Sequence, residues 1–210
     1  MFENLKPRPP DPLLDLIRQF RGDPRPRKLD LGVGVFQDES GRTPIPNAVK
    51  KAERHLLETQ DTKVYLGAEG DVEFARGLAT LAVGETAASD RIVALQAPGG
   101  TGALRLGAEL IRAANPGATV WLGRPTWPNH DAIFPAAGLK LAEYRYFDPA
   151  TQSVCFDALI AAMRGAPAGD VFVLHASSHN PTGADLTLAQ WQTIADVAAE
   201  RGIVPFVDFA

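Results

Sequence analysis

A glycine-rich turn, Pro98-Gly99-Gly100-Thr101-Gly102, lies between an apolar run and a helical pattern and is the first place where this chain could bind a charged ligand. Glycines let the backbone approach an anion closely, Thr101 adds a hydroxyl group, and a helix N-terminus offers free N–H groups. The turn matches neither Walker A nor G-x-G-x-x-G. It predicts a phosphate site, although a glycine turn after a strand is more often a simple change of direction.

Three further side chains could contact a flat polar ligand. Trp127 has an apolar ring with an N–H at its rim, which suits stacking on a heteroaromatic ring. His130 could orient an acid, and Asn180 offers both a donor and an acceptor next to a proline that favours a cis peptide bond. Each has a commoner structural role, as a packing residue or a partner in a structural hydrogen bond.

Asp208 follows the apolar run Val204-Pro205-Phe206-Val207, so its carboxylate should lie at the edge of the interior. A buried charge needs a partner, and the alternative role is to cap the next element. A phosphate turn, a stacking ring, an amide and a carboxylate together fit a phosphorylated pyridine ring. The carboxylate would keep the ring nitrogen protonated, which makes such a ring an electron sink.

The elements that must position these residues form a regular pattern in the second half of the chain. Short apolar runs predict parallel strands covered on both faces, and helical patterns alternate with them. Thr187 and Gln190 form a capping box before one helix, and Pro205 conflicts with a central strand. The fold class is therefore α/β, with ligands beyond the carboxyl ends of the strands. The predicted strands are residues 92–97, 119–122, 171–175 and 203–207.

The first half of the chain is less regular. Residues 1–12 contain four prolines and predict an extended arm, residues 15–21 a short helix, and residues 29–36 an edge strand whose glycines, including Gly34, could admit a ligand. A helix should begin at Pro46-Asn47 with Val49 and Leu56 on one face. Another should begin at Asp71 and bury Phe74, Leu78 and Leu81, and Tyr65 falls in the loop between the two.

Composition limits the kind of ligand. The chain is 45% hydrophobic with a net charge of −4 and interspersed signs, which gives no electrostatic footprint for nucleic acid or an anionic membrane. One cysteine excludes an intrachain disulfide framework and fits a reducing compartment. No apolar run approaches the length of a membrane span, and we see no signal peptide. We therefore expect a cytoplasmic protein with a small-molecule ligand and no metal ion.

Over essentially its whole length the sequence resembles the class I aminotransferases of fold type I, specifically the aspartate/aromatic amino-acid branch. No single motif is specific, but the order of six of them makes chance a poor explanation. They are Leu31-Gly32-Val33-Gly34-Val35, the segment 63–67, the segment 97–105, Thr126-Trp127-Pro128-Asn129-His130, His179-Asn180-Pro181-Thr182-Gly183 and Val207-Asp208-Phe209-Ala210.

The resemblance implies a fold type I transferase that binds pyridoxal 5′-phosphate, with an arm over 1–12, a small-domain segment over 13–45 and part of the large domain over 46–210. It implies a homodimer with shared sites, in which Tyr65 reaches the phosphate in the neighbouring subunit. It further implies that Gly99, Gly100 and Thr101 bind the cofactor's phosphate, that Trp127 stacks on its ring and that Asn180 contacts its phenolic oxygen. Asp208 would pair with the ring nitrogen, with His130 and His175 behind this carboxylate. The substrate would lie near Gly34, Trp127 and Asn180.

The implied reaction moves an amino group from an amino acid, aspartate or aromatic, to a 2-oxo acid such as 2-oxoglutarate in two half-reactions. The family needs a Schiff-base lysine in a Ser-x-Ser-Lys setting, and none of the six lysines here has one. We therefore expect no catalytic residue of that kind in this chain, a lysine beyond Ala210, and no activity from the 210 residues alone. The resemblance also implies that Val35, Gln37, Thr43, Val64 and Thr101 surround the side-chain pocket. Val64 is apolar where strictly aspartate-using relatives tend to be polar, while Gln37 and Thr43 remain polar, so we expect mixed acidic and aromatic specificity.

Three other functions stay open from the sequence. Another fold type I reaction, a lyase or decarboxylase, would share the ring-binding residues. The chain could also be a non-catalytic fragment that binds a phosphate ligand, or a nucleotide-binding α/β domain, which would have no use for Asp208.

Overall fold

The computed structural model describes residue 3, residues 12–30, residue 32 and residues 34–210. It forms two compact units, Met1–Val64 and Tyr65–Ala210, which are described separately. Most of the predicted arm lies outside the described residues, as do Leu31 and Val33 of the glycine-containing run.

The first unit contains α1 (Pro12–Gly22) and α2 (Asn47–Thr59), so both predicted helices are confirmed. The edge strand expected over residues 29–36 is wrong, because its described residues form no strand. The apolar side chains of α2 are exposed, Leu57 most of all, and none of its residues is buried among the described residues.

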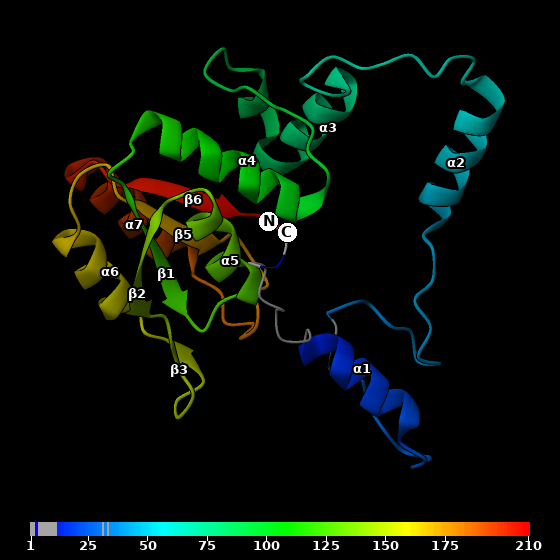
Figure 1. Cartoon of the computed structure of the whole chain (residues 1–210), viewed down its shortest axis with the longest axis horizontal. Helices are drawn as coiled ribbons and strands as arrows, with labels where there is room; N and C mark the ends of the chain where they lie inside the picture. Colours follow the sequence, from blue (N-terminus) through cyan, green and yellow to red (C-terminus); the bar gives the residue numbers. More distant parts are fainter. Residues whose placement is uncertain (1–2, 4–11, 31, 33) are drawn as a thin grey trace. The chain divides into compact units, whose positions relative to one another are not determined.

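The second unit is built on a parallel sheet of four strands in the order β2-β1-β5-β6 (Figure 1). The apolar runs at 119, 171 and 203 were correctly predicted as strands, and the register aligns Val120 with Val171 and Val171 with Val204. The edge strand β2 was not predicted because its alternating polar residues lack a continuous apolar run. The strands are β1 (Thr119–Arg124), β2 (Lys140–Arg145), β5 (Val171–His175) and β6 (Val204–Asp208).

Two pairs of helices cover the two faces of this sheet. Alternate strand residues point to opposite faces, so Val120 and Val173 pack with α4 (Gly99–Ala114) and α5 (Pro128–Ala136). Trp121 and Phe172 pack on the other face with α6 (Phe156–Gly165) and α7 (Leu188–Arg201). The result is a three-layer α/β/α unit, which confirms the predicted fold class (Figure 1). The capping box of Thr187 and Gln190 begins α7 as predicted.

Two predictions for the start of this unit are wrong. Residues 92–97 form no strand, and Val93 is 83% exposed, because no described strand pairs with this run and no layer covers it. The helix begun by Asp71, α3 (Val72–Val83), leaves Phe74, Leu78 and Leu81 exposed, and it buries only Ala75. A short 3-10 helix, η2 (Gly84–Ala88), follows, and β3 (Phe147–Asp148) and β4 (Ser153–Val154) form a small hairpin.

Pro205 fits β6 because β6 lies at the edge of the sheet. The N–H of Val204 donates to Asp170 O, and Asp208 O accepts from the N–H of Ala176, so residues 204 and 208 turn their backbone groups toward the rest of the sheet. The backbone groups of residue 205 alternate to the open side, where a missing N–H breaks no ladder bond. The conflict found in the sequence therefore disappears.

No described helix combines the length and the apolar character that crossing a bilayer requires.

Candidate functional site

The candidate residues gather where β1, β5 and β6 end. From β1 the chain moves outward through α5 to β2, whereas from β5 it moves through α7 in the opposite direction to β6. The order of the strands therefore reverses between β1 and β5, and in doubly wound sheets ligands bind beyond the carboxyl ends at such a point. His130 follows β1, while His175 and Asp208 are the last residues of β5 and β6.

Asp208 and His130 form the central pair of this site. His130 is fully buried, and its Nε2 lies 3.2 Å from Asp208 Oδ2, while the Asp208 side chain keeps 17% of its surface exposed. The other ring nitrogen, Nδ1, lies 2.8 Å from Thr126 Oγ1. The hydrogen bond from His130 is the main cause that lowers the pKa of Asp208, against the opposing effect of burial. Asp208 is thus an ionised carboxylate with one face toward solvent.

Trp127 lies beside this pair at the N-cap position of α5. Pro128 occupies the first helical position, where its fixed φ suits the helix and no N–H bond is lost. The half-buried indole ring meets the ring of His130 edge to face, with centroids 5.6 Å apart and planes at 89°. The residues from Thr126 to His130 therefore place an aromatic surface and a buried imidazole at the end of β1.

The loop after β5 is held by a carboxylate that the sequence analysis did not consider. Asp185 accepts hydrogen bonds from the N–H groups of Ser178 and His179, each at 2.8 Å, and these bonds lower the pKa of Asp185. The N–H of Asn180 donates to His175 Nδ1 at 3.0 Å, which ties this candidate residue to the sheet. The Asn180–Pro181 peptide is cis, as the sequence suggested.

His175 has one ring nitrogen without a partner. Its Nε2 is buried and makes no hydrogen bond to any described residue. His130, His175 and Asp208 each place a nitrogen or oxygen atom within 4.8 Å of the others. Burial is the main cause that lowers the pKa of His175, and the nearby His130 lowers it further, while Asp208 and Asp185 oppose the shift. The site therefore contains a polar atom suited to a ligand or to a neighbouring carboxylate.

The glycine turn begins α4. Gly99 has a φ of 68°, in the region that favours glycine, and its N–H donates to Ala97 O at 2.9 Å. Pro98 makes no side-chain cap bond among the described residues, so the first turn of α4 is left to other partners, and Gly99, Gly100 and Thr101 are exposed. Figure 1 shows this end of α4 on the side at which β6 ends.

Two further candidate residues are exposed. Tyr65, the first residue of the second unit, is fully exposed at a relative value of 104%. Gly34 is exposed and belongs to the first unit, which the structure does not place relative to the second.

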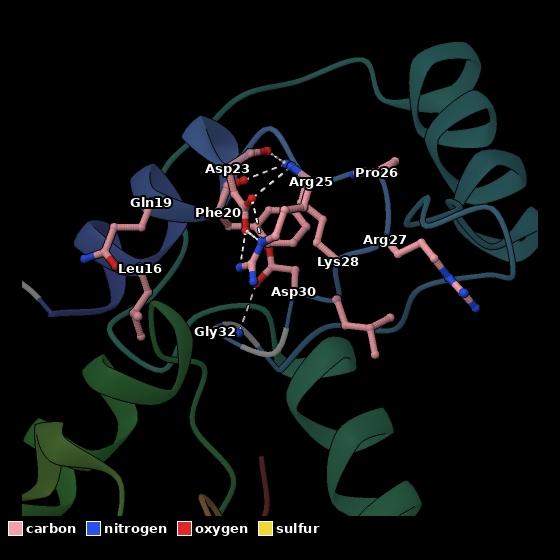
Figure 2. A pocket seen from close by; sticks show the side chains of 11 residues that line it. Leu16, Gln19, Phe20, Asp23, Arg25, Pro26, Arg27, Lys28, Asp30 and Gly32 are labelled. Carbon is pink, nitrogen blue, oxygen red and sulfur yellow. Dashed lines mark hydrogen bonds and ion pairs between the residues drawn. The ribbon is translucent and has the colours of Figure 1, made fainter.

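The first unit has a cavity of its own, with a volume of about 1090 Å³ between α1 and the segment that follows it (Figure 2). Its charged groups are mostly satisfied internally. Arg25 pairs with Asp23, and the Lys28 ammonium donates to the carbonyl oxygens of Phe20 and Asp23 at 2.7 and 2.8 Å. None of the candidate site residues lines the cavity, so it supports no assignment.

The second unit contains a single lysine, Lys140. It is the first residue of β2 and is exposed. The strands are parallel, so Lys140 lies at the amino end of the sheet, opposite the end that holds Asp208. Lys140 is therefore not part of this site.

The fold defines an α/β protein of the doubly wound class, in which an aromatic ring and an ionised carboxylate lie where the strand order reverses, the position at which ligands bind in this class. Comparison with known proteins makes this class specific. Residues 26–210 match the family model described as "Aminotransferase class I and II". The chain belongs to this family.

Its relatives are about twice as long. The chain is 55% identical over 210 residues to a tyrosine aminotransferase of Rhizobium meliloti, covering all of this chain and 54% of that protein. It is 47% identical over 213 residues to an aspartate aminotransferase of Escherichia coli, again covering all of this chain and 54% of the relative. The chain thus spans about half the length of the curated relatives it matches.

A solved structure agrees with this result. The aromatic-amino-acid aminotransferase of Burkholderia pseudomallei, described as covalently bound to pyridoxal phosphate, superposes with a TM-score of 0.95 at 41% identity. The match covers the whole of this chain and 53% of that one. The resemblance seen in the sequence is therefore confirmed.

Proposed function

We propose that this chain supplies the ring- and phosphate-binding part of an enzyme that transfers an amino group from an amino acid to a 2-oxo acid with pyridoxal 5′-phosphate. One observation carries the proposal: Asp208 is an ionised carboxylate, 3.2 Å from a buried histidine and partly open to the space beyond the strand ends. A cationic pyridine nitrogen is the partner that such a carboxylate fits.

The residues present fit this cofactor. Asp208 would pair with the ring nitrogen, and His130 holds the carboxylate from behind. Trp127 would stack on the ring. Gly100 and Thr101, in the uncapped first turn of α4, would bind the phosphate, together with Gly99, whose own N–H already bonds to Ala97. Asn180, whose backbone N–H is bonded to His175, would contact the phenolic oxygen with its side chain.

The chain's own groups would act by position and charge. When bound, pyridoxal phosphate supplies an electron sink for a carbanion at the substrate's α-carbon. Asp208 keeps a proton on the ring nitrogen, because a nearby negative charge favours the protonated form. The positive end of the α4 dipole holds the phosphate dianion. Thr126, through His130, keeps the carboxylate in one orientation.

The proton transfer at the α-carbon requires a base that this unit does not provide, since Lys140 lies at the opposite end of the sheet. We propose that further polypeptide supplies a Schiff-base lysine, in line with relatives of about twice the length. The 210 residues alone would then bind cofactor without turnover.

We extend the proposal to the whole protein by analogy with the relatives. Its amino donors would be aspartate and aromatic amino acids, since relatives named for each match this chain. The assembly would be a homodimer in which Tyr65 reaches the partner's phosphate, and Gly34 would lie over the substrate's carboxylate. The proposed organisation is an arm over 1–12, a small-domain segment over 13–45 and large-domain residues 46–210. A cytoplasmic location fits the single cysteine.

The competing functions have less support. The relatives named above are aminotransferases, which argues against a lyase or decarboxylase. A nucleotide-binding domain would not explain why Asp208 is held as an anion by a buried histidine.

Titration of the chain with pyridoxal 5′-phosphate, followed by tryptophan fluorescence, tests the proposal. Wild-type protein should show saturable quenching, and Trp127→Phe should lose most of that signal while Trp191→Phe, on α7, keeps it. Inorganic phosphate should compete, because it binds the same first turn of α4. Equal binding of ADP, or no saturation with pyridoxal phosphate, would contradict the proposal.

A further inference from the structure

Three aromatic rings are stacked behind the candidate site, and only one of them, His175, belongs to the cluster with His130 and Asp208. The rings of Tyr146 and His179 lie face to face with centroids 4.0 Å apart and planes at 13°. Those of His179 and His175 follow at 4.2 Å and 27°. The ring of His175 then meets the ring of His130 at 5.4 Å and 63°. We call Tyr146, His179 and His175 the ring column.

The outer end of the ring column is fixed on several sides. Tyr146 is 3% exposed, and its hydroxyl group donates to Ala184 O at 2.6 Å. Its N–H donates to Arg124 O, and its carbonyl oxygen accepts from the N–H of Cys155. Burial raises the pKa of Tyr146 to about 12, so this hydroxyl keeps its proton near neutral pH. Tyr146 is thus a rigid wall against which His179 packs.

The middle ring is fixed as well. His179 is 5% exposed, its N–H donates to Asp185 Oδ1, and its Nδ1 lies 2.8 Å from Thr182 Oγ1. The ring therefore has little freedom to rotate away from its two neighbours.

The inner ring, His175, receives the effect of this packing. Its Nδ1 accepts a hydrogen bond from the N–H of Asn180, so the proton of the neutral ring must be on Nε2. Nε2 is buried without a partner among the described residues, and His175 belongs to the cluster in which one nitrogen or oxygen atom of each of His130, His175 and Asp208 lies within 4.8 Å of the others. Rotation of this ring would break the bond to Asn180 and move the Nε2 proton away from the carboxylate.

We propose that His179 is a positioning residue of the cofactor site, which holds His175 in the Nε2–H tautomer beside Asp208 by stacking between His175 and Tyr146. The effect of His179 on cofactor binding rests on the proposed function. In that function, a fixed N–H near Asp208 helps to keep the carboxylate ionised opposite the ring nitrogen of pyridoxal phosphate. The His175 tautomer itself can be measured without cofactor.

A neutral His179 stacks between its neighbours without the cost of a buried charge, and its surroundings favour that form. Burial lowers the pKa of His179 to about 4, and repulsion from His175 adds to this shift. The groups facing His179 are His175 from β5, Tyr146 from the β2–β3 connection, Asp185 and Thr182 from its own loop, and His130 from α5. Among these groups, Asp185 favours the charged form of His179, but its effect on the pKa is smaller than that of burial and smaller than that of His175.

Nitrogen-15 NMR of the imidazole rings tests the proposal directly. The chain has four histidines, and His55, exposed on α2, is an internal reference. We expect wild-type His175 to show one tautomer, with the proton on Nε2. His179→Ala should give mixed tautomers and raise the pKa of His175 by about one unit, since part of its burial is lost. His179→Phe keeps a stacking ring and should preserve the tautomer.

The possible results distinguish a role of His179 in positioning His175 from a purely structural role in the core. If His179→Ala leaves the tautomer and pKa of His175 as in the wild type, the proposal is wrong. If that variant does not fold, Tyr146→Leu against Tyr146→Phe applies the same comparison at the outer ring. In bound pyridoxal phosphate, His179→Ala should lower the pH at which the ring nitrogen loses its proton, and His179→Phe should not. A wild-type chain that binds no cofactor would contradict the proposed function, while the tautomer still decides the role of His179.

Discussion

At the scale of single residues, the candidate site depends on a carboxylate whose ionised form is favoured mainly by one neighbour. The hydrogen bond from His130 lowers the pKa of Asp208, and the exposed part of the carboxylate remains available for a cation. Trp127 contributes a ring surface next to the same histidine. The fold thus brings Trp127 and His130, which follow β1, together with Asp208, the last residue of β6.

Replacing this carboxylate tests its role in ligand binding. Asp208→Asn should weaken binding of pyridoxal phosphate about 10- to 1,000-fold, because an opposite charge nearby shifts a titrating group by about 1–3 pKa units. Asp157→Asn, in the first turn of α6, removes an equal charge on the far face of the sheet and should leave the affinity unchanged. Titration calorimetry measures both. Equal affinities of the two variants would contradict the assignment.

The buried histidines should make stability depend on pH. The pKa of His179 is about 4 in the folded chain, against 6.5 for an unperturbed histidine. Between these values the unfolded chain binds more protons, so the free energy of unfolding falls as the pH decreases from 6.5 toward 4 and the effect levels off below 4. Asp208 affects stability at a lower pH than His179 does, since the stabilisation that it contributes is lost only as the pH falls through its lowered pKa.

Urea unfolding at pH 7 and pH 5 measures this dependence. The midpoint should decrease toward pH 5 in the wild type, and His179→Phe should show a smaller decrease because it removes one of the groups that take up protons on unfolding. The comparison uses the change with pH within each protein, so a general loss of stability in the variant does not affect it. A decrease of the same size in both proteins would refute the assignment.

At the scale of elements, the position of α4 follows from a close contact with β6. A Cβ atom at Gly107 would lie 2.6 and 2.8 Å from Cε2 and Cζ of Phe206, whose ring also packs edge to face on Phe134. Only glycine lets the helix lie this close to the strand. Because α4 begins with the glycine turn, this contact also fixes the position of the helix N-terminus that would bind a phosphate.

A pair of matched substitutions tests this packing. Gly107→Ala should lower the free energy of unfolding by about 1–3 kcal/mol, because overpacking outweighs the gain in helix propensity. Gly77→Ala, in α3, meets no atom within 4 Å and should raise it by up to about 1 kcal/mol. Chemical denaturation of both variants gives the comparison, and two changes of the same sign would show that the contact with Phe206 is unimportant.

The elements also show how far the sequence could be interpreted. The buried strands β1 and β5, the capping box and Asp208 at the end of β6 were predictable, because continuous apolar runs and short-range hydrogen bonds are local signals. The run that forms β6 was expected to be covered on both faces, but it lies at the sheet edge and none of the residues of β6 is buried. The strand expected at 92–97 was not found, since an apolar run forms a strand only beside a pairing partner. β2 was missed because Lys140, Glu143 and Arg145 interrupt its apolar residues and leave no continuous apolar run. Asp185, Tyr146 and His179 act through contacts that no local pattern reveals.

At the scale of the whole molecule, apolar side chains are exposed on several elements besides α2 and α3. They include Val93 and Leu95 in the run 92–97, and Val207 and Phe209 at the open edge of β6. In relatives about twice as long, further polypeptide is available to cover such side chains.

The isolated chain should therefore bind cofactor but not catalyse transfer. With aspartate and 2-oxoglutarate it should form no glutamate above background, because none of its six lysines has the Ser-x-Ser-Lys setting and Lys140, the single lysine of the second unit, is at the opposite end of the sheet. Co-refolding with the part of the Escherichia coli relative that this chain does not match should give measurable glutamate formation. Robust turnover by the 210 residues alone would show that the missing-base argument is wrong.

The central claim, that Asp208 holds the pyridine nitrogen of a phosphate-anchored cofactor in its cationic form, has a direct test. Nitrogen-15 NMR of ring-labelled pyridoxal 5′-phosphate bound to the chain reports the protonation of that nitrogen across pH. The account predicts that the wild-type chain keeps the nitrogen protonated to a pH about 1–3 units higher than Asp208→Asn does. Identical titrations in the two proteins, or a bound nitrogen that titrates as it does in free solution, would contradict it.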